Sequence, residues 1–225
     1  MQLGSKIVGH LLGSLLLSGA MARSARADCP ADTIEVCGMV VSVTPSSSAT
    51  GCGPLSDATG TYNLPAGTVS AQSDADYPDG HAVAHVTTED IYFIVGPPLS
   101  SPISFSADLV AHGHGSSYYC TSASGSATLR SDAGMQQVTF HGMSCQGEGV
   151  DRTVSLPQLR MVGEPFHLIM DVVASPSPGA SAAMDASLAF SGLPPGYAIE
   201  SCQGYSSNPT PARPASWGQV KVRYR

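Results

Sequence analysis

The segment "DLVAHGHGSSYYC", from Asp108 to Cys120, carries residue types that commonly bind metal ions. His112 and His114 stand two residues apart, and Asp108 precedes them at the same parity. On a β-strand, residues i and i+2 share a face about 7 Å apart, so two imidazoles can chelate one ion. A complete site needs three or four ligands. Besides Asp108, the candidates for these positions are His81, His85 and His141.

The pattern around the two histidines favours a different interpretation. Residues 103–112 alternate apolar side chains, among them Phe105 and Leu109, with mostly polar ones. His112 and His114 therefore fall on the face opposite to the core, in water. The glycines beside them are also typical of a strand end. We expect solvated histidines, with a metal site of Asp108, His112 and His114 as the alternative.

The segment "DADYPDG" at 74–80 resembles a calcium-binding loop in its donors. Asp74, Asp76 and Asp79 supply carboxylate oxygens, and Gly80 permits a sharp turn. The EF-hand spacing is not met, because one residue too many separates Asp76 from Asp79, and His85 stands where a bidentate glutamate is required. Residues 69–81 are expected to form a solvated polar loop, with calcium binding as the alternative.

Catalytic patterns are weak in this chain. It has no G-x-S-x-G nucleophile elbow, and nothing in the sequence pairs two carboxylates across a cleft. We therefore expect neither an enzyme nor a resident cofactor. Aromatic side chains offer sugar-stacking surfaces instead: Tyr118, Tyr119, Tyr197, Tyr205 and Trp217. Adjacent residues on a strand face opposite ways, so at most one of Tyr118 and Tyr119 is expected on one platform.

The six cysteines predict disulfides in an oxidising compartment. Cys120 and Cys145 flank turn-forming segments, "SASGS" and "SDAG", which predict that the chain doubles back between them. We predict a bond between these two cysteines, with Cys52 and Cys202 as alternative partners of Cys120. The pairing of the others stays open: Cys29, Cys37, Cys52 and Cys202.

The first 27 residues have the pattern of a secretory signal peptide. Lys6 precedes an apolar stretch, and "ARA" at 25–27 predicts cleavage after Ala27. The mature chain then holds 7 basic against 17 acidic residues, a balance that disfavours nucleic acid and anionic membrane. We expect a secreted or periplasmic protein with no transmembrane segment in its mature part.

Short alternating segments separated by turns predict an all-β fold, an antiparallel β-sandwich or jelly roll. The candidate strands occupy 33–44, 81–96, 103–112, 136–142, 152–156 and 218–225. Segments 165–175 and 182–190 surround a Pro/Gly turn and predict a hairpin. Its buried residues would be Phe166, Leu168, Met170, Leu188 and Phe190, and its exposed acids Asp171 and Asp185. Residues 28–225 are expected to form a single disulfide-stapled domain.

Residues 166–205 resemble the β-sandwich region of bacterial exported proteins of the PEP-CTERM-sorted type. The shared features are a strand ending near "L-P-x-G" and a following Ser-x-x-Gly, at Leu193, Pro194, Gly196, Ser201 and Gly204. Those proteins also carry a C-terminal sorting segment, whereas this sequence closes on "VKVRYR". The resemblance implies an exported sandwich of the cell envelope or extracellular matrix that is released rather than sorted, and it supplies no catalytic residues.

Two functions follow from these patterns. The first is a non-catalytic structural or binding module whose partners are envelope or matrix components. The alternative is a metal- or carbohydrate-binding module that uses the His112/His114 strand or the exposed aromatics. A third ligand near the histidines would favour metal, whereas a concave aromatic groove would favour carbohydrate.

Overall fold

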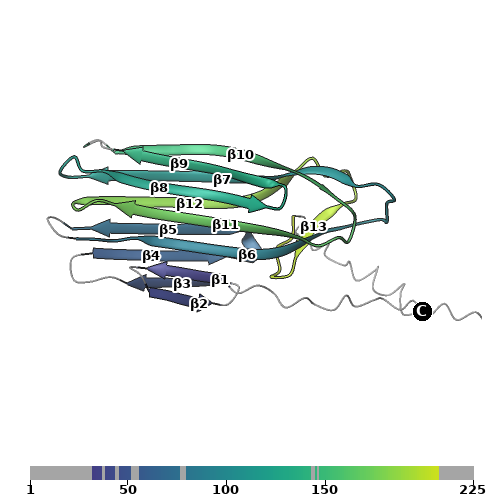
Figure 1. Cartoon of the computed structure of the whole chain (residues 1–225), viewed down its shortest axis with the longest axis horizontal. Coiled ribbons are helices and arrows are strands. Elements are labelled where there is room, and N and C mark those ends of the chain that lie inside the picture. The colour runs from purple at the N-terminus through teal and green to yellow at the C-terminus, as the bar shows by residue number, and fades with distance from the viewer. Residues whose placement is uncertain are drawn as a thin grey trace, which may run out of the picture.

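The computed structural model describes residues 32–36, 39–43, 46–51, 56–76, 80–142, 145 and 147–207. These residues form two antiparallel sheets packed face to face, so the predicted all-β sandwich is confirmed. Figure 1 shows that the strands of both sheets run along the long axis of the molecule. Among the described residues, no helix has the length and apolar character to cross a membrane.

The first sheet, sheet A, has β6 and β11 at its centre. In spatial order it contains β2 (Met39–Val43), β1 (Asp32–Val36), β6 (Ala84–Val95), β11 (Phe166–Pro176), β8 (Ala123–Ser131) and β9 (Gly134–Gly142). A short strand, β13 (Ala198–Ser201), also pairs with β6, beyond the point where β1 ends.

The second sheet, sheet B, is centred on β12 and β5. Its order is β10 (Glu148–Arg160), β7 (Ile103–Ser117), β12 (Ala180–Ser191), β5 (Thr68–Ala75), β4 (Ser56–Asn63) and β3 (Ser46–Gly51). A one-turn 3₁₀ helix, η1 (Leu64–Ala66), joins β4 to β5. Pro157 is tolerated in β10 because that strand is an edge, paired on one side only, where proline within sheets is usually found.

The core lies between the sheets and is filled largely by small and medium side chains. Along β7 and β11, every second residue is buried, as period-two alternation requires. At one end the core becomes aromatic, with contacting rings from Tyr92, Phe105, Phe166, Phe190 and Tyr205. This cluster compensates for the many alanines elsewhere in the interior.

Polar contacts also join the sheets. The buried Ser73 of β5 donates to the carbonyl oxygen of Ala174 in β11 at 2.9 Å. At the other side, Arg160 of β10 forms an ion pair with Asp132 in the β8–β9 turn. The Arg160 guanidinium lowers the pKa of Asp132 through this hydrogen bond. These bonds connect strands that share no ladder.

The late hairpin prediction is wrong. β11 belongs to sheet A and pairs with β6 and β8, whereas β12 belongs to sheet B and pairs with β5 and β7. The turn at 177–179 therefore crosses the core. Its backbone bonds to both sheets: the Ser177 N–H donates to Ser122, and the Gly179 N–H donates to Ala75. Two alternating segments bury the same faces whether they pair side by side or face each other, so the pattern does not separate these cases.

The burial predicted for this region is largely confirmed, with two exceptions. Phe166, Leu168, Met170 and Leu188 are buried and Asp185 is exposed. Phe190 is only half-buried, because it lies where β12 leaves the core. Asp171 is not exposed, because other side chains of sheet A surround its carboxylate.

Other boundaries also differ from expectation. Residues 68–75 form β5 rather than a loop. The sequence pattern did not reveal this strand because its inward side chains, Val69, Ala71, Ser73 and Ala75, are too small to give a strong apolar signal. Strand β7 continues to Ser117 instead of ending near the histidines. Residues 1–31 and 208–225 lie outside the described residues, so the signal peptide and the final strand stay predictions.

Candidate functional site

The glycines of the His-Gly-His segment have a packing role. Gly113 and Gly115 occupy positions of β7 that face the core, and the ring of Phe140 lies against both of them. A Cβ on Gly113 would lie 2.6 Å from both Phe140 and Met184. This inward requirement places His112 and His114 on the outer face of sheet B, as the parity predicted.

The histidines do not gather a ligand set within the described part of the chain. His112 Nδ1 lies 3.1 Å from Asp151 Oδ1 on the neighbouring strand β10, and both side chains are exposed. Asp108 shares their face but lies four residues from His112 along β7. In the described residues, no group of three His, Cys, Asp or Glu side chains is placed to hold a metal ion. Metal binding by Asp108, His112 and His114 therefore gains no support here.

The acidic segment is split by the end of β5. Asp74 points outward from the strand and is half-buried, whereas Asp76 follows the strand and is exposed. Asp79 lies outside the described residues, so the calcium prediction for Asp74, Asp76 and Asp79 is untested. Asp74 stands in register with Asp57 on β4 and Ser181 on β12.

A groove of about 570 Å³ opens beside these acids, and we call it the tyrosine groove. Tyr118 is 94% exposed and Tyr119 is 60% exposed. The prediction that only one of them serves a platform is wrong, because they follow the end of β7, where strand alternation no longer applies. The polar lining and the two rings come from Asp74, Asp76, Ser116, Tyr118, Tyr119 and Ser181.

The backbone beneath the two tyrosines is held by hydrogen bonds. The Ser117 hydroxyl oxygen accepts from the N–H of Tyr119 at 3.2 Å and from that of Thr121 at 2.9 Å. The Tyr118 N–H donates to the Gly179 carbonyl oxygen at 3.2 Å, which joins this loop to the β11–β12 turn. The tyrosines therefore extend from a backbone already fixed before any ligand arrives.

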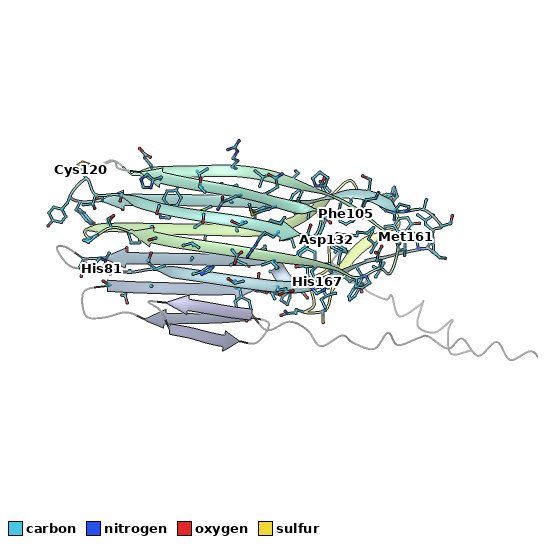
Figure 2. All side chains as sticks on the ribbon, in the orientation of Figure 1. His81, Phe105, Cys120, Asp132, Met161 and His167 are labelled. Carbon is cyan, nitrogen blue, oxygen red and sulfur yellow. A yellow bond between two sulfur atoms is a disulfide. The ribbon has the colours of Figure 1, made fainter. Side chains whose placement is uncertain are left out.

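The predicted disulfide between Cys120 and Cys145 is confirmed, with Cα atoms 4.6 Å apart. It joins the β7–β8 loop to the β9–β10 loop, and Figure 2 shows Cys120 at the end of the sandwich opposite Met161. Cys120 has a left-handed backbone (φ 56°), an arrangement that costs an L-residue about 1–2 kcal/mol. Cys202 is also disulfide-bonded, and the remaining three, Cys29, Cys37 and Cys52, lie outside the described residues.

A second groove, of about 410 Å³, lies on the same outer face of sheet B, and we call it the hydroxyl groove. One cross-strand row crosses it, and each member is in register with the next: Thr61 on β4, Ser70 on β5, Asp185 on β12 and His112 on β7. Sequence reasoning missed Thr61 and Ser70. For Ser70, the available signal was the alternation of hydroxyl-bearing and small residues in 68–75, a segment whose sequence predicts a loop.

The outer face of sheet A has a different chemistry. The Asp171 carboxylate accepts a hydrogen bond from Thr87 at 2.7 Å, forms an ion pair with Arg130 and lies 3.5 Å from His85. Burial alone would raise the pKa of Asp171, but hydrogen bonds from His85, Thr87 and Arg130 outweigh it and lower the pKa to about 2. Nearby, His167 Nδ1 lies 3.0 Å from Glu89 Oε1.

Fold and site together define a disulfide-braced antiparallel β-sandwich with an open aromatic and acidic groove at one end of sheet B. No protein-family model matches the chain, and no curated protein matches it. Among solved structures, the chain is similar to TmCBM61 in complex with beta-1,4-galactotriose. The two are 12% identical with a TM-score of 0.32, over 64% of this chain and 87% of that chain.

Proposed function

We propose that this protein is a non-catalytic carbohydrate-binding module whose ligand occupies the tyrosine groove. The observation that carries the proposal is the joint position of Tyr118 and Tyr119 beside Asp74 and Asp76. A tyrosine ring offers a rigid apolar face on which the C–H face of a sugar ring can stack. The adjacent carboxylates accept hydrogen bonds from sugar hydroxyls.

The site is suited to binding because it needs little rearrangement. Ser117, the Cys120–Cys145 disulfide and the Gly179 carbonyl hold the loop backbone, so less conformational entropy is lost when a ligand binds. No nucleophile or base is required for this role. A sugar ligand also unites the two functions expected from the sequence, since envelope and matrix polymers include polysaccharides.

We also propose that the protein acts outside the cytoplasm. The Cys120–Cys145 disulfide and the disulfide-bonded Cys202 support this, because such bonds persist mainly in oxidising compartments. Determining the N-terminal residue of the exported chain tests cleavage after Ala27.

The direct test is a glycan array followed by titration calorimetry with the best ligand. Tyr118→Ala is expected to weaken binding at least about fivefold, the equivalent of an aromatic contact worth about 1 kcal/mol. Met135→Ala is the matched control, because Met135 is a large exposed side chain on β9 in sheet A. Equal losses in both variants, or no glycan bound by the unaltered protein, would contradict the proposal.

A second test concerns the fixed backbone. Replacing Cys120 and Cys145 by serine releases the loop beneath the tyrosines, so affinity should fall while every groove side chain is retained. The bond closes a segment with a sequence separation of 25. On the chain-entropy model its loss costs about 3.5 kcal/mol of folding stability. Affinity is therefore measured at a temperature where circular dichroism shows that the variant is folded, and unchanged affinity there would exclude preorganisation by the disulfide.

A further inference from the structure

The tyrosine groove and the hydroxyl groove share three strands of sheet B. Asp74, Ser181 and Ser116 line the first, on β5, β12 and β7 respectively. Four residues further along the same strands, Ser70, Asp185 and His112 line the second. At 3.3 Å per residue, the two rows are about 13 Å apart along the strand direction. The two grooves therefore lie at two positions along the same strands, on one face of the sheet.

The surface between the grooves is low and polar. The intermediate row consists of Gln72 on β5, Ala183 on β12 and His114 on β7, in register with one another. Ala183 occupies the centre of this row, so no large side chain rises between the grooves on β12. The floor at the tyrosine end includes the Ser116 and Ser181 hydroxyl groups, whose oxygens are 2.7 Å apart. A flexible chain can lie along β12 and contact hydroxyl, amide and carboxylate groups throughout.

The charge of this face limits which polymers fit. The outward positions of the described strands β4, β5, β12, β7 and β10 hold no lysine or arginine. They carry carboxylates instead, at Asp57, Asp74, Asp108, Asp151 and Asp185. The two arginines of β10, Arg152 and Arg160, occupy positions of the opposite parity. Carboxylates that share one face repel further negative charge. A polymer bearing carboxylate or sulfate groups is disfavoured, whereas hydroxyl groups find acceptors.

We propose that the outer face of sheet B binds a linear polysaccharide without acidic groups, extended along β5 and β12 from Tyr118 to Ser70 and Asp185. This rests on the proposed function, because the sugar stacked on Tyr118 and Tyr119 is one unit of that chain. Further units contact Gln72 and then the Ser70–Asp185–His112 row. Affinity should therefore increase with chain length.

The experiment measures affinity against chain length. Cellulose-, xylan- and galactan-type oligosaccharides of two to six units are titrated into the mature protein, and in the series that binds, the six-unit chain should bind about tenfold or more tighter than the two-unit chain. Asp185→Ala and Ser70→Val should each weaken the six-unit chain by about 2- to 10-fold, the range for one hydrogen bond, and leave the two-unit chain unaffected. Tyr118→Ala should weaken both lengths. Glu200→Gln, an exposed acid on β13 in sheet A, is the control and should change neither.

The outcomes separate the two proposals. If no glycan binds at any length, the carbohydrate-binding function fails. If the short and long chains bind equally and Asp185→Ala has no effect, the ligand occupies the tyrosine groove only, and the proposed extension of the ligand along β5 and β12 is wrong. Polygalacturonate supplies the charge test: it should not bind to the unaltered protein, and the combined Asp74→Asn and Asp185→Asn substitutions should raise its affinity. Tight binding of polygalacturonate by the unaltered protein would overturn the exclusion of acidic chains.

Discussion

The outer faces of the two sheets are both built from alternating strands, but their carboxylates have different surroundings. On sheet A, Asp171 is enclosed by Arg130, Thr87 and His85, and its side chain is only 16% exposed. On sheet B, the backbones of Asp74 and Asp185 pair with neighbouring strands, but neither carboxylate forms a hydrogen bond or ion pair with another described residue. One carboxylate is satisfied within the protein, and the others face solvent.

This difference indicates different roles. A carboxylate whose hydrogen bonds are made internally stabilises the fold, because it exchanges water for protein partners that are already in place. A carboxylate without such partners adds little to stability and keeps its lone pairs for a ligand. The contrast predicts that substitutions on sheet A reduce stability, whereas substitutions on the sheet B face reduce binding.

The largest effect is expected in the core that both faces share. Leu188→Ala on β12 removes a buried side chain and should lower the free energy of unfolding by about 2–5 kcal/mol. Chemical denaturation monitored by circular dichroism measures this. A cost below about 0.5 kcal/mol, the range of surface changes, would mean that the two faces of β12 are exchanged and would remove the basis of the comparison.

The second-largest loss of stability is expected from a substitution on the inward side of the histidine segment. Gly113→Val forces a side chain against Phe140 and Met184 and should cost about 1–3 kcal/mol, as overpacking does. His114→Ala, one residue away and outward, should stay within about 0.5 kcal/mol of the unaltered protein. Thermal melts of both variants test the assignment, and a destabilised His114→Ala would show that the outer face of sheet B contributes to folding.

The direct comparison of the two faces pairs Asp171→Asn with Asp185→Asn. The first leaves Arg130 without its carboxylate partner and should cost about 1.5–3 kcal/mol at neutral pH, the range for hydrogen bonds to charged groups. The second should change stability by less than about 0.5 kcal/mol. Equal costs from denaturant titrations would abolish the distinction between the faces.

The contribution of the same carboxylate should also depend on pH. The pKa of Asp171 is lowered to about 2, so the folded state favours its ionised form. Its contribution is complete above the ordinary aspartate pKa of about 3.9 and is lost as the pH falls through about 2. The stability difference between the unaltered protein and Asp171→Asn should therefore shrink as the pH falls from 5 to 2. A difference that stays constant down to pH 2 would mean that the carboxylate charge is not what stabilises this face.

Local patterns predicted most of the strands, and for a physical reason. Side chains alternate with period two on any strand that has one buried face, so the segments around Phe105, Leu109, Leu168 and Leu188 could be assigned without knowledge of their neighbours. The same pattern failed for 68–75. There the buried side chains are valine, alanine and serine, whose small size gives little contrast in hydrophobicity with the polar positions.

The sequence alone determined the all-β class of fold and the outward parity of His112 and His114, because both depend on local alternation. It favoured Cys145 as the partner of Cys120 but left Cys52 and Cys202 open, and the tertiary structure decided that pairing. Only the tertiary structure decided which strands are neighbours. It placed β11 and β12 on opposite sheets and brought Tyr118 beside Asp74, 44 positions apart in the numbering. Alternation specifies which face of a strand is buried. It does not specify whether two successive strands pair within one sheet or belong to opposite sheets, because both arrangements bury the same faces. The whole set of tertiary contacts makes that choice.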